Sequence, residues 1–398
     1  MFLGIDIGTT AIKIGLLEER KIIYQRSFPI YTKTEKGRTQ SASEIIAVLL
    51  KGITEIPSSL REQITVIGFS TAMHSLMPVI NEKFEEIYIW SDNQASQVIA
   101  EFRQSSLSES FYRQTGTPIH AMSPFAKLLH FKSAGGFDGK TKWYGLKELV
   151  MLLFTGAPWI DRSTASATGL YSLEEKNWSQ EILHYLDLSI EQFAPICDTT
   201  DRFPIAASAA ARYGLNETVE IMCGASDGCL AAYAGYVSTG IKNSLTIGTS
   251  AAVRKVTDQP VFDQRQNFCY YLKEGQYVIG APSNNGGCVL AWIKETLAQD
   301  PDTFYESLPR IIEETTIGSH GLRFFPFING ERAPYWTSDI KASYHGLTIQ
   351  HTRTDMIRGA IEGMLLNIGV LKEMAAITDE VTISGGVFQS KAIAQLTA

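Results

Sequence analysis

The segment FLGIDIGTTAIKIGLL at residues 2–17 contains two short apolar runs that are separated by a Gly-Thr-Thr turn. Apolar runs of this length around a turn predict the two strands of a hairpin, and the run at residues 21–28 predicts a third strand of the same meander. The central part, IGTTAI at residues 7–12, returns as IGTSAA at residues 247–252, again between two strand-like runs. The repeat predicts a duplicated domain with one loop rich in glycine and hydroxyl groups in each copy.

The rest of the chain reads as a mixture of helices and strands. Ser41-x-x-Glu44 precedes apolar residues at helical spacing, which predicts a capping box and a helix. The elements expected after it are strands at 64–69 and 87–90, helices in much of 93–215, strands again from 219, a hairpin at 268–280, a long helix after residue 354 and a strand at 381–384.

The composition excludes several classes of protein. The chain has 398 residues, enough for two or three domains, and its formal net charge of −7 disfavours nucleic acid as a partner. No uncharged apolar run approaches the ~20 residues that cross a bilayer, and Asp6 interrupts what would be the core of a signal peptide. The five cysteines form no Cys-x-x-Cys pair. We therefore expect a cytoplasmic protein with reduced thiols and no membrane partner.

The two Gly-Thr loops carry groups that suit a phosphate. In the first loop, Asp6 ends a strand, Thr9 and Thr10 supply hydroxyl and amide groups, and Lys13 follows on the next strand. Such a loop can hold phosphate oxygens, with the carboxylate of Asp6 in the shell of a Mg²⁺ ion. The second loop, at residues 246–250, offers the same chemistry. An ordinary hairpin turn is the simpler explanation for either loop taken alone.

Four further side chains could act on a substrate. Asp227 follows a predicted strand and precedes a helix of small residues, where a carboxylate can serve as a general base or can simply cap the helix. His74 and His120 lie in polar breaks between apolar runs, and each is either a ligand or a structural histidine. Asp92 ends a strand, and it can accept hydrogen bonds from substrate hydroxyls or cap the following helix.

Signatures of several other enzyme classes are absent from the sequence. It contains no G-x-x-x-x-G-K-[ST], no H-E-x-x-H, no G-x-S-x-G, and no G-x-G-x-x-G after the first strand. A P-loop kinase, a zinc protease, an α/β-hydrolase and a Rossmann dehydrogenase therefore have no support.

Together the motifs resemble the FGGY family of carbohydrate kinases along nearly the whole chain, from DIGTT at residues 6–10 to SGGVFQSK at 384–391. The segments TAMHSLMPV, TGTPIHAMSPFAKLL, STASATGLYSL, ASDG, TIGTSAAVR and NNGGCVLAW are most similar to the gluconate kinases of that family. Their joint occurrence in order is more specific than any single motif. The resemblance implies an α/β fold of two duplicated actin/hexokinase-like (ribonuclease H-like) ATPase domains around a cleft, at residues 1–237 and 238–398.

The resemblance also implies roles for individual residues. Asp227 matches the catalytic base of the family, and Asp6 matches the acid near Mg²⁺. The positions that match contacts with ATP are Thr9, Thr10, Lys13, Gly248, Thr249, Gly287, Gly386 and Ser390. The positions that match sugar contacts are Met73, His74, Asp92, Met122 and Asp227. His120 and Lys127 join His74, from their spacing, as candidate donors for a substrate carboxylate.

The implied reaction is the phosphorylation of D-gluconate to 6-phosphogluconate, with Mg-ATP held between the two domains. A kinase of another polyol or ketose, such as xylulose, shares every phosphate and base residue, and a catalytically silent sugar-binding relative is a second alternative. The expected partner is a small sugar acid or polyol, and the sequence leaves a homodimer open. Members of the family normally continue past the Gly-Gly strand with another strand and helix, so we expect the C-terminal domain, which ends here at Ala398, to be truncated.

Overall fold

The computed structural model describes residues 1–35, 37–136 and 138–398. The chain forms two compact units. The first contains Met1–Ala231 and Cys269–Tyr277, and the second contains Ala232–Phe268 and Val278–Ala398. The return of the chain to the first unit at Cys269–Tyr277 has no counterpart in the domain limits expected from the sequence. None of the helices in the described parts of the chain combines the length and the apolar character that crossing a bilayer requires.

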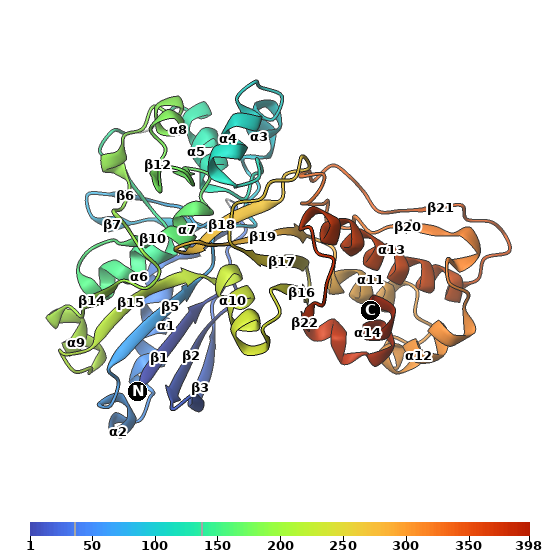
Figure 1. Ribbon diagram of the computed structural model, residues 1–398, viewed down its shortest axis with the longest axis horizontal. Helices are drawn as coiled ribbons and strands as arrows, with labels where there is room; N and C mark the ends of the chain where they lie inside the picture. The colour runs from blue at the N-terminus through green and yellow to red at the C-terminus, as the bar shows by residue number, and fades with distance from the viewer. Residues whose placement is uncertain (36, 137) are drawn as a thin grey trace. The chain divides into compact units, whose positions relative to one another are not determined.

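The first unit is built on a six-stranded sheet with the strand order β14-β15-β5-β1-β2-β3 (Figure 1). Its strands are β1 (Phe2–Ile7), β2 (Ala11–Glu18), β3 (Lys21–Pro29), β5 (Val66–Thr71), β14 (Arg202–Pro204) and β15 (Glu220–Ser226). Strands β1, β2 and β3 form the predicted antiparallel meander, and β5 runs parallel to both β1 and β15. The carboxyl ends of β1, β5 and β15 therefore lie at one edge of the sheet.

The alternation of buried and less buried residues along β1 shows which face of the sheet packs against the core. In β1, Leu3, Ile5 and Ile7 are at most 1% exposed, while the residues between them point to the other face. The buried face packs with residues of α1 (Ala42–Thr54), α6 (Leu146–Thr155) and α9 (Ala207–Tyr213) in one apolar cluster. Helix α1 begins where the sequence predicts it, because the hydroxyl of Ser41 accepts the Glu44 amide at 3.4 Å.

Smaller elements complete the first unit. They are β4 (Thr39–Ser41), α2 (Ser58–Arg61), β6 (Met77–Ile80), β7 (Lys83–Phe84), β8 (Glu86–Tyr88), α3 (Ser96–Phe102), α4 (Ser108–Thr115), α5 (Pro124–Ser133), β9 (Lys142–Tyr144), β10 (Ile160–Asp161), α7 (Arg162–Ser166), β11 (Tyr171–Ser172), β12 (Asn177–Trp178), α8 (Gln180–Tyr185), the 3₁₀ turn Ile190–Gln192 and β13 (Ile196–Cys197). Helix α10 (Asp227–Thr239) follows β15 and runs into the second unit.

The sheet of the second unit repeats the start of the first. Strand β16 (Asn243–Ile247) is antiparallel to β17 (Ala251–Thr257) and parallel to β22 (Thr382–Ser384), as β1 is to β2 and β5. Asp6 of β1 faces Ser70 of β5, and Thr246 of β16 faces Ser384 of β22. Both pairs are bonded, at 2.7 Å for Ser70 and Asp6 and at 3.0 Å for the two hydroxyls. Only the first copy carries a carboxylate at this position.

The later part of the chain contains further strands, helices and turns. They are β18 (Phe268–Lys273), β19 (Gln276–Ser283), α11 (Gly287–Thr296), α12 (Phe304–Glu314), the 3₁₀ turn Ser319–Gly321, β20 (Arg323–Phe325), β21 (Ser343–His345), α13 (Arg353–Met374), the 3₁₀ turn Gly386–Gln389 and α14 (Lys391–Thr397). Strand β19 lies beside β17 in the order β19-β17-β16-β22.

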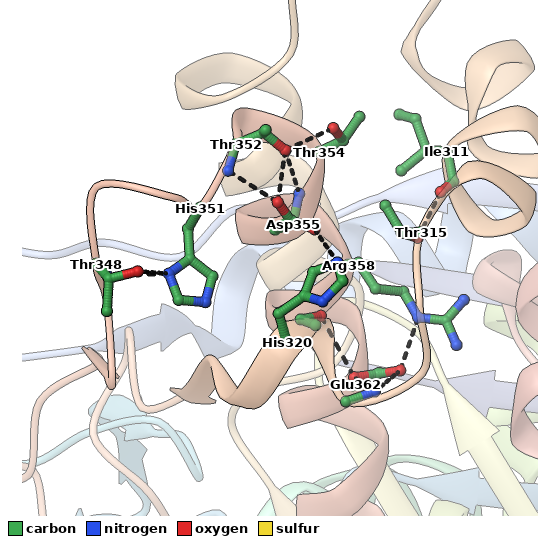
Figure 2. A network of polar contacts seen from close by, with 12 residues as sticks. Ile311, Thr315, His320, Thr348, His351, Thr352, Thr354, Asp355, Arg358 and Glu362 are labelled. Carbon is green, nitrogen blue, oxygen red and sulfur yellow. Dashed lines mark hydrogen bonds and ion pairs between the residues drawn. The ribbon is translucent and has the colours of Figure 1, made fainter.

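Helix α13 is the long helix that the sequence predicts. It begins with a capping box, in which the amide of Thr352 donates to Asp355 Oδ2 at 2.8 Å (Figure 2). One turn later, the buried guanidinium of Arg358 donates to Glu362 Oε1 at 2.7 Å. The same carboxylate accepts the Gly318 amide at 3.1 Å. These bonds tie the first half of α13 to the loop that precedes β20.

The parallel pairing of β5 with β15 contains a bulge. Met222 faces Gly68 and Ala225 faces Ser70, so β15 has one residue more than β5 in this interval. Gly224 lies in the bulge with φ +74°. A Cβ atom at Gly224 would stand 1.9 Å from the Phe69 carbonyl oxygen, so a side chain cannot be accommodated without a shift of backbone.

We predict that Gly224→Ala lowers the free energy of unfolding of the first unit by more than about 2 kcal/mol, since both the positive φ and the backbone clash penalise a Cβ atom. Gly15→Ala in β2 is the matched control, because nothing lies within 4 Å of the Cβ it would add. It should change stability by less than about 0.5 kcal/mol. Denaturant unfolding measures both variants, and equal stabilities would contradict the prediction.

Candidate active site

Two carboxylates lie at the shared edge of the first sheet. Asp6 is the second-last residue of β1, and its Oδ1 accepts the hydroxyl of Ser70 at 2.7 Å. Asp227 follows β15 directly and begins α10, with its Oδ1 accepting the Gly228 amide at 2.8 Å. The side chain of Asp6 is 35% exposed, and Asp227 is half-buried. The structure thus brings both predicted acids to the edge at which β1, β5 and β15 end.

The first Gly-Thr loop is held from the neighbouring segments. Thr9 accepts a hydrogen bond on Oγ1 from Trp90 Nε1 at 2.9 Å, and its carbonyl accepts one from Gln40 Nε2 at 2.6 Å. Thr10 is exposed. Lys13 Nζ lies 3.7 Å from Asp6 Oδ2, and its side chain is 59% exposed. An ion pair so exposed is weak, which leaves the Lys13 ammonium available to a phosphate.

His74 is fixed in an unusual backbone conformation. It has φ +66° and is buried, and its Nδ1 lies 2.7 Å from the carbonyl oxygen of Ala167. A ring nitrogen at this distance from a carbonyl carries the hydrogen, so Nε2 is the acceptor in the neutral ring and a second donor in the charged ring. Nε2 lies 3.5 Å from the hydroxyl of Tyr270. Met73, the residue before it, is half-buried.

Lys127 joins two of the predicted sugar-contacting segments. Its ammonium donates to the carbonyl of His74 at 3.2 Å and to the carbonyl of Met122. The amide of Met122 in turn donates to His120 Nδ1 at 3.2 Å. Burial lowers the pKa of Lys127 to about 7, although the negative charge of Asp92 acts in the opposite direction and raises it. Lys127 therefore holds the backbone of these segments. A direct contact between Lys127 and a substrate carboxylate stays a prediction.

Asp92 is almost fully buried, and its oxygens already have protein donors. Oδ2 accepts the Arg38 amide at 2.8 Å and the side chain of Gln94 at 3.0 Å, and Oδ1 accepts the Gln94 amide at 3.3 Å. These bonds fix the loop before α3. A contact between Asp92 and a sugar stays a prediction.

The segment 269–277 supplies residues that the sequence did not single out. The Tyr271 amide donates to Ser166 Oγ at 2.9 Å, and the Tyr271 hydroxyl donates to Asp198 Oδ2 at 2.8 Å. Arg162 donates to the same oxygen at 2.8 Å. Burial alone would raise the pKa of Asp198, but the bonds from Tyr271 and Thr199 and the charge of Arg162 lower it. The sequence of this strand, which is apolar with two tyrosines, does not predict that Tyr271 would bond to Ser166 and Asp198.

The second unit brings together the glycines expected to contact nucleotide. The amide of Gly287, the first residue of α11, donates to Gly248 O at 2.7 Å, and the next amide donates to Thr249 O at 3.0 Å. A Cβ atom at Gly287 would stand 2.6 Å from Gly248 O and 3.0 Å from Val387. Gly386 directly precedes Val387 along the chain, and Ser390 directly precedes α14. The three segments converge because glycine permits the close approach.

A buried carboxylate fixes the loop that precedes α11. Glu331 is 0% exposed, and it accepts the Ser283 hydroxyl at 2.6 Å and the Asn284 amide at 2.7 Å. The side-chain amides of Asn285 and Asn367 donate to the same carboxylate at 3.2 and 2.9 Å. Four donors from β19, its loop and α13 therefore hold the Asn-Asn-Gly-Gly segment. Nothing in the sequence around Glu331 predicted this cluster of hydrogen bonds.

The residues at the first edge are compatible with Mg²⁺. The described residues include no group of three or more His, Cys, Asp and Glu side chains that could hold a metal by themselves. Mg²⁺ usually keeps several waters and binds through one or two carboxylates together with substrate phosphates. A single, partly exposed carboxylate such as Asp6 fits this requirement.

The fold agrees with comparisons to known proteins. Residues 1–234 match the N-terminal domain of the FGGY family of carbohydrate kinases, and residues 243–398 match its C-terminal domain. The chain belongs to this family and is therefore a sugar phosphotransferase. FGGY kinases use ATP as phosphate donor, generally with Mg²⁺. The family and the two-domain actin/hexokinase-like fold expected from the sequence are confirmed.

Individual relatives span most of the chain. The chain is 33% identical to the gluconokinase of Bacillus subtilis (strain 168) over 387 residues, which is 92% of this chain and 75% of that protein. A gluconate kinase from Lactobacillus acidophilus superposes with a TM-score of 0.93 at 30% identity, covering 100% of this chain and 83% of that one. A ligand-bound xylulose kinase from the same organism superposes with a TM-score of 0.91 at 29% identity and the same coverage.

We predict that Lys127→Met removes a pH dependence from stability. Below pH 7 the Lys127 amine is charged in both the folded and the unfolded state. Between pH 7 and about 10.5 the folded state holds fewer protons than the unfolded state, because the pKa of the folded amine is about 7. The free energy of unfolding of the unaltered protein should therefore rise relative to that of the variant, by up to about 1.4 kcal/mol per pH unit.

Denaturant unfolding at pH 7, 8 and 9 measures this difference. Burial raises the pKa of Glu148 to about 7, but Glu148 is present in both proteins. Its contribution therefore cancels in the difference between their free energies of unfolding. Lys51→Met, at an exposed ion pair, is the control and should show no trend. A constant difference between the Lys127 variant and the unaltered protein across this range would contradict the prediction.

Proposed function

We propose that this kinase phosphorylates D-gluconate on its terminal hydroxyl, giving 6-phosphogluconate and ADP. The observation that carries the proposal is the 33% identity to a gluconokinase over 92% of the chain. It is supported by the arrangement around His74, whose Nε2 becomes a donor when the ring is charged and can then meet a carboxylate. Gluconate is a sugar acid, so a positively charged donor on the sugar side favours it over neutral ketoses.

In the proposed reaction, Asp227 orients the sugar and takes its proton. The terminal hydroxyl oxygen forms a bond to the γ-phosphorus of ATP, the bond from that phosphorus to the β–γ bridging oxygen breaks, and ADP leaves with the electron pair. The hydroxyl proton passes to a carboxylate oxygen of Asp227. Because the transition state is loose, the main contribution of Asp227 is position, and its role as a base comes late.

The remaining residues hold the phosphates and the nucleotide. In the first unit, Thr9, Thr10 and Lys13 would donate to phosphate oxygens, and Asp6 would hold Mg²⁺ through its water shell. Mg²⁺ bound there would neutralise charge on the phosphates. In the second unit, Gly248, Thr249 and Gly287 would allow the nucleotide to approach the backbone closely. Gly386 and Ser390 would contact it from the segment before α14.

A kinase of xylulose is the second candidate. It is favoured by the structural likeness to a xylulose kinase, with a TM-score of 0.91 at 29% identity. That reaction would use the same base and the same phosphate-holding residues. Only the segments around His74 and Met122 would distinguish the two substrates.

We predict that Asp227→Asn lowers kcat for gluconate phosphorylation by about 10²–10⁴-fold, because the amide cannot accept the proton. Binding of ATP, measured by calorimetry, should stay within about threefold, since Asp227 is not among the proposed nucleotide contacts. Asp201→Asn changes an aspartate of the same unit that has no proposed role in the reaction. It should keep most of the activity. Retention of most activity by the Asp227 variant would remove this residue from the role of base.

A further inference from the structure

The ammonium of Lys147 is buried deep in the first unit and has three partners. Lys147 lies on α6, and its Nζ is 3.1 Å from Asp161 Oδ2, with both side chains 0% exposed. It also donates to the carbonyl of Phe69 at 3.2 Å and to the carbonyl of Cys223. These three contacts match the three N–H donors of an ammonium group. Full pairing is what allows a charge to be buried this deeply.

The two carbonyls belong to the bulge that precedes Asp227. Phe69 lies on β5 opposite the extra residue of β15, and Cys223 immediately precedes Gly224. The amides of Cys223 and Gly224 donate outward, to Asp201 O and Thr199 O at 3.1 Å each. A bulge disrupts the ladder of hydrogen bonds between two strands. Lys147 supplies donors to both strands at this point.

Asp161 links the same ion pair to the residue before Asp227. It caps α7, since its Oδ1 accepts the Thr164 amide at 2.8 Å. Ser163, in the first turn of that helix, has its hydroxyl 3.0 Å from the hydroxyl of Ser226. The ion pair of Lys147 and Asp161 is therefore connected to β15 at two points. The Lys147 ammonium contacts the bulge directly, and Asp161 caps the helix whose Ser163 contacts Ser226.

We propose that Lys147 is a positioning residue for Asp227. Its ammonium, anchored by Asp161, fixes the two carbonyls of the bulge and so sets the direction in which β15 delivers Asp227. A buried ion pair is weak evidence for stability, because an apolar pair of similar size often serves as well. An apolar side chain cannot donate to the carbonyls of Phe69 and Cys223, which is why the ammonium is required here. The proposal rests on the proposed role of Asp227 in catalysis.

The test uses the double variant Lys147→Met/Asp161→Asn, which removes the ammonium without leaving a buried carboxylate charge unpaired. Displacements near 1 Å cost about 10²-fold in rate, so kcat for gluconate should fall about 30- to 300-fold. KM for gluconate should stay within about threefold, since the proposed sugar contacts other than Asp227 (Met73, His74, Asp92 and Met122) lie outside the bulge. Hydrogen exchange of the free protein should become faster in the peptide covering residues 221–230.

Leu149→Ala is the matched control. Leu149 lies on the same helix and is 0% exposed, but its loss creates a cavity without removing a donor from the bulge. At a temperature well below its Tm, this variant should keep kcat within about threefold. Its exchange in the 221–230 peptide should match that of the unaltered protein. A general loss of core stability would affect both variants alike.

Two outcomes overturn the proposal. One is a folded double variant with kcat near that of the unaltered protein. The other is unchanged exchange in the 221–230 peptide. If the double variant does not fold, Lys147→Met/Asp161→Ser, in which the serine can also cap α7, is measured in the same two ways against the same expectations. If the unaltered chain phosphorylates no sugar at all, the proposed function fails, while the exchange comparison still decides the role of Lys147.

Discussion

The parallel pairing of β5 with both β1 and β15 is the constraint on which the rest of the first unit depends. The carboxyl ends of parallel strands lie at the same edge of a sheet, so this pairing alone brings Asp6 and Asp227 to one edge. The bulge at Gly224 then changes the course of β15 just before Asp227. The ion pair of Lys147 and Asp161 fills the gap in the hydrogen-bond ladder that such a bulge opens.

Duplication of the strand–turn–strand unit gave two copies with different chemistry. Strand β16 is antiparallel to β17 and parallel to β22, as β1 is to β2 and β5, yet Thr246 stands where the first copy has Asp6. The second turn is also one residue shorter, since Ile247 pairs with Ala251 whereas Ile7 pairs with Ile12. We infer that the first copy kept the charged group for metal and phosphate, and that the second became a glycine-lined surface for nucleotide.

Local patterns predicted the parts of this fold that depend on neighbouring residues. The meander of β1, β2 and β3, the cap at Ser41 and the long helix α13 follow from apolar spacing and capping residues. Lys147 and Glu331 could not be found in this way, because adjacent charged residues, such as Lys147-Glu148 and Glu331-Arg332, are typical of a solvated surface. Their burial depends on partners far along the chain, 78 residues away for Phe69 and 48 for Ser283. Tyr270 reaches His74 from 196 residues away.

The identity of the phosphorylated sugar decides whether the residues around His74 select a sugar acid. The chain would be incubated with Mg-ATP and an equimolar mixture of gluconate and xylulose. The phosphorylated products would then be separated and identified by mass spectrometry. We expect 6-phosphogluconate as the main product, formed together with one ADP per molecule. Xylulose phosphate as the main product would keep the catalytic residues and contradict the role given to His74 and its surroundings.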